Sequence, residues 1–147
     1  VQQFHRWYLH QKLPTIDIAR AHYFVARQNQ LYGDFDAALA EFAAQVAEYP
    51  FSDRAQRSLL FSGVILCRDK QQYDQGIDLL QRALNVSDDL TASDHVVDWR
   101  AVENFYLGRC YESKGEPEKA MPHFAEAAKA SIRDAAYRYV NYTTMHS

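Results

Sequence analysis

The sequence predicts an all-α fold, a right-handed α-α superhelix built from helical hairpins. Apolar residues recur every three or four positions over most of the chain, as in Ala120, Phe124 and Ala127. The five Gly and four Pro lie mostly between these apolar stretches, where helices end. This distribution favours helices joined by short turns over a fold of many strands.

Composition and charge limit the classes of protein that the chain can represent. The 147 residues are enough for one domain with a real core, and 48% of them are hydrophobic. A net charge of -3 provides no basic face of the kind that binds nucleic acid. The sequence contains no run of about 18 apolar residues, so we expect no membrane span.

The first hairpin is predicted over residues 19–52. Thr15 can cap a helix that continues to Leu31, Gly33 ends that helix, and Asp34 begins the next one. Pro50 then closes the unit. The sequence therefore indicates two antiparallel helices with a tight glycine turn between them.

A second hairpin with the same spacing is predicted over residues 101–134. Its turn glycine is Gly115, and the steps from this glycine to Ala120 and Phe124 equal those from Gly33 to Ala38 and Phe42. Small residues such as Gly108 and Ala120 let two helices approach closely, while large rings fill the space beside them. With Leu107 and Tyr111, this pattern resembles the tetratricopeptide repeat, a helix-turn-helix unit of ~34 residues.

A middle unit of the same kind is predicted over residues 57–90, less regular than the other two. Gln71 occupies its turn in place of glycine, and Gly76 and Leu80 lie at the expected steps beyond it. An insertion follows at residues 87–98, with a capping-box-like start at Thr91–Asp94. We expect a loop at residues 87–91 and an early, lengthened first helix for the third unit.

The two ends of the chain are predicted to flank the repeats within a single domain, residues 1–147. Residues 1–14 carry Phe4, Trp7 and Tyr8 on one helix face and end in proline. This aromatic helix either caps the first hairpin or anchors a partner. Residues 135–147 are expected to form a capping helix whose tyrosine rings are buried and whose hydroxyl groups are exposed to solvent.

No motif in the sequence indicates catalysis, a cofactor or a bound metal. Cys67 and Cys110 lack Cys-x-x-Cys spacing and are interpreted as small buried hydrophobic residues. His22 and His123 fall on helix faces without the spacing of a metal site. We therefore expect a protein that is not an enzyme and needs no cofactor.

The resemblance to tetratricopeptide repeats implies a binding surface on the concave face, which the first helices of the hairpins line. Counted from Ala19, Arg57 and Ala101, the positions that point into this face form an aromatic floor with three arginines along it. Arginine and aromatic residues dominate interface energetics. We therefore expect a protein partner that offers a peptide or helix with acidic and apolar groups. The expected contact residues are Tyr23, Arg27, Gln30, Phe61, Ser62, Ile65, Arg68, Phe105, Tyr106, Arg109 and Glu112.

Other functions remain open at the level of sequence. Repeats that clamp chaperone tails use Lys, Asn and Arg where this chain has Tyr23, Arg27, Ser62, Val102 and Tyr106, which argues against that subtype. An alternative function is a structural subunit or self-associating module that uses the aromatic ends. The joint at residues 49–55 resembles that of bacterial envelope lipoproteins. The compartment stays open between the cytoplasm and the bacterial periplasm or cell envelope, and homo-oligomers stay open too.

Overall fold

The computed structural model describes residues 15–50, 52–90 and 98–129. The helices follow one another in pairs with short turns within each pair. They are α2 (Thr15–Leu31), α3 (Phe35–Glu48), α4 (Asp53–Val64), the π-helical segment η1 (Ile65–Asp69), α5 (Tyr73–Leu90), α6 (Arg100–Lys114) and a further helix over residues 117–129. The expected helices at residues 1–14 and 135–147 lie outside the described residues.

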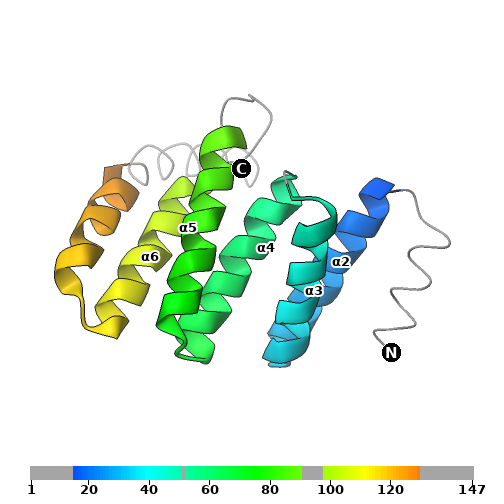
Figure 1. The fold of residues 1–147 in the computed structure, drawn as a ribbon, viewed down its shortest axis with the longest axis horizontal. Coiled ribbons are helices and arrows are strands. Elements are labelled where there is room, and N and C mark those ends of the chain that lie inside the picture. Colours follow the sequence, from blue (N-terminus) through cyan, green and yellow to red (C-terminus); the bar gives the residue numbers. More distant parts are fainter. Residues whose placement is uncertain (1–14, 51, 91–97, 130–147) are drawn as a thin grey trace, which may run out of the picture.

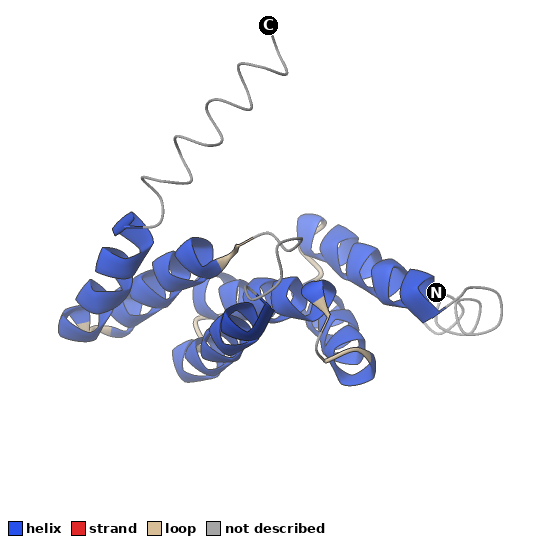
Figure 2. Ribbon diagram, turned by 90° about the horizontal axis from the view of Figure 1, so that it is seen from above, coloured by secondary structure: helices blue, strands red, loops and turns tan. Residues whose placement is uncertain are grey.

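The helices stand side by side in chain order, from α2 at one edge to the residue 117–129 helix at the other (Figure 1). All the regular elements that the structure describes are helices. In the view of Figure 2 the row of helices is curved, with its two ends displaced to the same side of its middle. The predicted fold class, an all-α helical repeat, is confirmed. The repeat boundaries 19–52, 57–90 and 101–134 stay predictions.

The three turns within the hairpins lie where the sequence predicts them. Gly33 and Gly115 adopt positive φ angles of 81° and 91°, and Gln71 adopts a φ of 55° in the middle hairpin. Only glycine enters this left-handed region without steric cost, so Gln71 is strained. As predicted, Asp34 caps the helix that follows the first turn, because its carboxylate accepts from the backbone N–H of Ala37 at 3.3 Å.

The left-handed backbone at Gln71 leads to a prediction about stability. Replacing Gln71 with glycine should raise the free energy of unfolding by about 0.5–1 kcal/mol, since the relief of steric strain exceeds the extra entropy of glycine in the unfolded chain. The opposite change, Gly33→Ala, should lower it by a similar amount. Urea denaturation at equilibrium measures both changes. A loss of stability in the Gln71→Gly variant would contradict the prediction.

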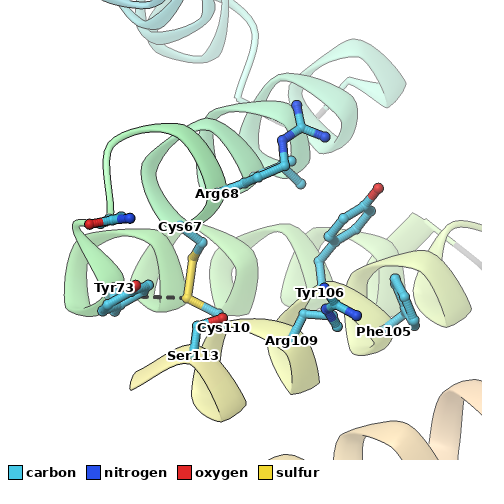
Figure 3. Close-up of a pocket in the computed structure, with 10 residues that line it drawn as sticks. Cys67, Arg68, Tyr73, Phe105, Tyr106, Arg109, Cys110 and Ser113 are labelled. Atoms are coloured by element: carbon cyan, nitrogen blue, oxygen red, sulfur yellow. Dashed lines mark hydrogen bonds between the residues drawn. A yellow bond between two sulfur atoms is a disulfide. The ribbon is translucent and has the colours of Figure 1, made fainter. Parts of the chain in front are cut away.

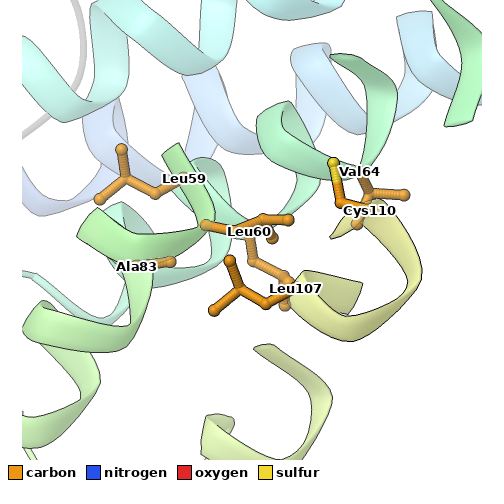
Figure 4. Packing of buried hydrophobic residues seen from close by; sticks show 7 residues of the cluster. Leu59, Leu60, Val64, Ala83, Leu107 and Cys110 are labelled. Atoms are coloured by element: carbon orange, nitrogen blue, oxygen red, sulfur yellow. The ribbon is translucent and has the colours of Figure 1, made fainter. Parts of the chain in front are cut away.

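The largest hydrophobic core joins α4, α5 and α6. Leu60, Leu80 and Leu107 are almost completely buried there, with Leu59, Val64, Ala83 and Cys110 around them (Figure 4). A methyl group on Gly108 would come within 2.5 Å of the ring of Phe124, so only glycine allows this close approach of α6 and the residue 117–129 helix. The small-and-large packing expected for these helices is confirmed.

The interpretation of the insertion at residues 87–98 is wrong in two respects. Residues 87–90 are not a loop, because α5 continues through Leu90. Nor is α6 lengthened into residues 98 and 99, since it begins at Arg100, where the Asp98 carboxylate accepts from the Arg100 backbone N–H at 3.0 Å. The helix continues at Ser87 because this side chain is fully buried between Gln56 and Glu103 and hydrogen-bonds with both. The expected start at Thr91–Asp94 lies outside the described residues.

The interpretation of the cysteines as separate hydrophobic residues is also wrong. Cys67 of η1 and Cys110 of α6 form a disulfide, with their Cα atoms 5.7 Å apart and a sequence separation of 43. The bond joins the first helices of the second and third hairpins. Gly76 of α5 makes room for it, because a Cβ atom at this position would overlap the Sγ atom of Cys67. The disulfide thus explains why the middle hairpin has glycine where the others have Ala38 and Ala120.

Candidate functional site

One hollow, here called the central hollow, is lined by the first helices of all three hairpins. It has a volume of about 410 Å³. Its walls consist of Arg27, Gln30 and Leu31 from α2, Leu60, Phe61 and Val64 from α4, Arg68 from η1, and Trp99, Val102 and Tyr106 at α6. Because residues of three helices far apart in sequence share it, this hollow lies on the face that the sequence predicts to be concave.

A second hollow, here called the disulfide hollow, adjoins the first and shares Val64, Arg68 and Tyr106 with it. Its volume is about 430 Å³. In the view of Figure 3, the side chain of Tyr106 lies between those of Arg68 and Arg109, with Phe105 beside it. The remaining lining residues are Cys67, Gln71, Tyr73, Cys110 and Ser113. Together the two hollows form a continuous surface across the three hairpins.

Among the described residues, three arginines and no carboxylate line the two hollows. The guanidinium of Arg27 lies 3.9 Å from the centre of the Phe61 ring and donates to the Gln30 side chain. Arg68 is 60% exposed, and its ion-pair partner in the described part of the chain is its neighbour Asp69, at 3.4 Å. Arg109 is exposed and forms no ion pair with another described residue. These arginines therefore retain N–H donors for an anionic ligand.

A further basic cluster lies at the α2 and α4 end of the same surface. The guanidinium of Arg54 lies 5.3 Å from the ring centre of Tyr23 and 5.7 Å from that of Phe24. Burial, and then the positive charges of Arg57 and Arg20, lower the pKa of Arg54. Phe24 itself is 58% exposed. The exposed Phe24 ring beside Arg54 extends the apolar and basic character of the two hollows.

Acidic residues are concentrated on the second helices of the first two hairpins. α3 carries three carboxylates and no basic residue, and α5 carries four aspartates with Arg82 as its one arginine. The described side chains of α2, by contrast, include Arg20 and Arg27 and no acid. The chain as a whole has a net charge of -3. The basic character of the two hollows therefore does not follow from overall charge and comes from the arginines that line them.

The structure distributes the expected contact residues among three environments. Seven line the two hollows: Arg27, Gln30, Phe61, Arg68, Phe105, Tyr106 and Arg109. Glu112 is exposed on α6 beside them and lines neither hollow. Tyr23 and Ile65 are buried in a core with Phe42, and Ser62 is buried and faces a different hollow, between α3 and α5. These three side chains therefore do not line the central hollow or the disulfide hollow.

Several residues that line the two hollows were not predicted from the sequence to lie there. Trp99 precedes α6, in a stretch interpreted as part of a lengthened helix, and the two cysteines were interpreted as core residues. A signal for the disulfide did exist. Cys67 and Cys110 occupy the eleventh and tenth positions of neighbouring repeats, which places them on facing turns of adjacent first helices.

One buried polar pair links the two helices of the first hairpin. His22 and Glu41 are buried, with Nδ1 and Oε2 2.8 Å apart, and link α2 to α3. Among the described residues, no group of three His, Cys, Asp or Glu is placed to hold a metal ion. No helix in this part of the chain is long and apolar enough to cross a membrane.

Comparisons with known proteins extend only to the fold. No protein-family model matches the sequence, and no curated protein matches it. The structure is similar to a crystal structure of MamA, with a TM-score of 0.66 at 17% identity over 81% of this chain and 61% of that chain. A second crystal structure of MamA protein gives a TM-score of 0.63 at 16% identity, covering 88% of this chain and 70% of the other. The chain thus spans less than two thirds of the first of these structures.

Proposed function

We propose that the protein is a non-catalytic scaffold of the tetratricopeptide-repeat type that binds a peptide or helix of a partner protein along its concave face. One observation carries this proposal: the first helices of three hairpins jointly line two adjoining hollows, and the described lining residues include three arginines and no carboxylate. Such a surface complements acidic groups and repels basic ones. The partner segment is therefore acidic.

The partner also carries apolar side chains. Phe105 is 44% exposed and Leu31 is 77% exposed at the edges of the hollows, although both are large hydrophobic residues. Phe61 and Tyr106 line the surface between them. Apolar anchors that enter such hollows would bury rings and aliphatic groups of both molecules, which is the main source of affinity in recognition of a helix by a groove.

The alternative function, self-association through the aromatic ends, depends on residues 1–14 and 130–147, which lie outside the described residues. Its test is the size of the chain across a dilution series. A mass that stays that of one chain at every concentration would count against it, whereas a mass that rises with concentration would favour it.

Selection of peptides tests the proposed function directly. A phage library of random linear peptides is selected on the purified, oxidised chain, and the recovered peptides should be enriched in acidic and apolar residues. The double variant Arg27→Glu, Arg109→Glu should bind a selected peptide at least about tenfold more weakly, because two attractive charges become repulsive. Fluorescence anisotropy measures the affinities.

A matched variant controls for the change in net charge. Lys119→Glu, Lys129→Glu makes the same change in charge on the residue 117–129 helix, where both lysines are exposed and line neither hollow. This variant should bind like the parent protein. Equal binding by the parent and the Arg27→Glu, Arg109→Glu variant would contradict binding at the concave face.

A further inference from the structure

We infer that the disulfide hollow is an anion subsite in which Arg68 and Arg109 attract a carboxylate of the partner, and that the Cys67–Cys110 disulfide sets the relative position of these two arginines. The inference rests on the proposed function and deepens it. It assigns a ligand group, two positioned donors and a covalent element that organises them.

The position of the arginines along the chain is the first argument. Arg68 directly follows Cys67, and Arg109 directly precedes Cys110. The disulfide therefore ties together the two backbone segments from which these side chains project. Without the bond, η1 and α6 would be held together at this point only by packing.

The surroundings of the bond form the second argument, since the local structure is adapted to it. The π-helical turn of η1 carries Cys67, and the strained Gln71 and the small Gly76 follow within the same hairpin. The Sγ atom of Cys110 lies 3.6 Å from the backbone oxygen of Tyr73, a packing contact because a disulfide sulfur has no hydrogen to donate (Figure 3). The bond is thus enclosed by the start of α5 on one side and faces the disulfide hollow on the other.

The chemistry of the lining is the third argument. None of the described residues that line this hollow is an Asp or Glu, and the nearest described partner of Arg68 is the adjacent Asp69 at 3.4 Å, a long contact at an exposed position. Two guanidinium groups on one hollow attract a carboxylate, which forms strong hydrogen bonds with arginine. Phe105 and Val64 beside them fit an apolar group next to that carboxylate. A glutamate followed by a large apolar residue has this chemistry.

The experiment uses two blocked dipeptides as probes, acetyl-Glu-Phe-amide and its neutral counterpart acetyl-Gln-Phe-amide. Each is titrated into the ¹⁵N-labelled, oxidised full chain, and the amide and arginine Nε–H shifts are followed by NMR. The glutamate probe should give saturable shifts at residues 67–71 and 105–113, and it should bind about tenfold more tightly than the glutamine probe. Equal binding of the two probes, or shifts centred elsewhere, would overturn the inference.

Reduction tests the role of the disulfide. Dithiothreitol passes two electrons and two protons to the S–S bond, giving the thiols of Cys67 and Cys110 and the cyclic disulfide of the reagent. With helicity verified by circular dichroism, the reduced chain should bind the glutamate probe about tenfold more weakly. Unchanged affinity in a folded reduced chain would refute the role of the bond.

Variants that keep the disulfide make the result independent of any change in folding. Arg68→Gln, Arg109→Gln should lose the preference for the glutamate probe, whereas Arg82→Gln, in the hollow between α3 and α5, should keep it. If a selected acidic peptide binds through Arg27 without regard to reduction or to Arg68 and Arg109, the subsite fails while the proposed function stands. If no acidic peptide binds, both fail.

Discussion

Reduction of the Cys67–Cys110 disulfide is expected to lower the free energy of unfolding by about 4 kcal/mol. The bond closes a loop with a sequence separation of 43 residues. Chain-entropy arguments give about 4 kcal/mol for a loop of this length, because the cross-link removes conformations from the unfolded chain. Such a loss would be a large fraction of the stability of a chain of this size.

The position of the bond explains why its loss should be felt locally. In a stack of repeats each unit contacts only its neighbours, so the third hairpin is held to the rest mainly by the packing of α6 on α4 and α5. The disulfide adds a covalent link at this interface. After reduction, hydrogen exchange should therefore accelerate more in residues 100–129 than in α2 and α3.

Variants distinguish a disulfide from two independent buried thiols. Urea denaturation is measured for Cys67→Ala, Cys110→Ala and the double variant under oxidising conditions. Each single variant should lose nearly as much stability as the double one, because either change removes the whole bond. Two small losses that add up in the double variant would contradict the prediction and restore the interpretation of separate buried side chains.

The elements of the fold followed from the sequence because local signals agreed with the packing. Gly33 and Gly115 are needed for left-handed turns, and the turn at Gln71 was predicted by the repeat spacing alone, against the preference of the residue. The C-terminal end of α5 and the start of α6 were not predicted. The continuation of α5 through Ser87 depends on the burial of this residue between Gln56 and Glu103, a tertiary contact with no local signal.

The sequence predicted which face carries the candidate site, but it did not predict which side chains of that face are buried. Repeat positions identified the face that carries Arg27, Arg68 and Arg109, because helix periodicity fixes which side chains share a direction. Periodicity does not fix how far a side chain projects beyond its neighbours. Tyr23 and Ile65 share the direction of the arginines, yet α3 and α4 pack around them closely enough to bury both.

A buried polar cluster joins the three helices of the main core and makes the stability of the protein depend on pH. Glu103 of α6 is fully buried and accepts from the Ser87 hydroxyl, and the Gln56 Nε2 atom lies 3.5 Å from the same carboxylate oxygen. Within the described part of the chain, Oε2 of Glu103 and Oε1 of Gln56 have no hydrogen-bond partner. Two orphan acceptors favour a proton on the carboxyl group.

The environment of Glu103 raises its pKa from 4.5 to about 7. Burial is the main cause, and the negative charges of Asp98 and Asp88 add to it, while the hydrogen bonds from Ser87 and Gln56 oppose it. Arg100 pairs with both aspartates, at 2.9 Å and 3.6 Å. The folded protein therefore binds more protons than the unfolded chain between pH 4.5 and about 7.

Stability should consequently fall as the pH rises through this window and stay low above it. The loss at Glu103 amounts to at most about 3 kcal/mol at neutral to alkaline pH. Glu103→Gln removes the titrating group and keeps the size of the side chain, so the variant should be more stable than the parent at about pH 8, with little difference between them at about pH 4.5. Urea denaturation across the pH range measures this difference.

The matched control is Glu112→Gln, which removes an exposed carboxylate from the same helix. It should leave the pH dependence of the parent unchanged, because this side chain is exposed and takes no part in the buried cluster of Glu103, Ser87 and Gln56. If Glu103→Gln kept the parent's slope between pH 4.5 and 7, the buried carboxyl would not be the group that titrates. Since Glu103 contacts both α4 and α5, a flattened slope would show instead that one proton stabilises the junction of the second and third hairpins.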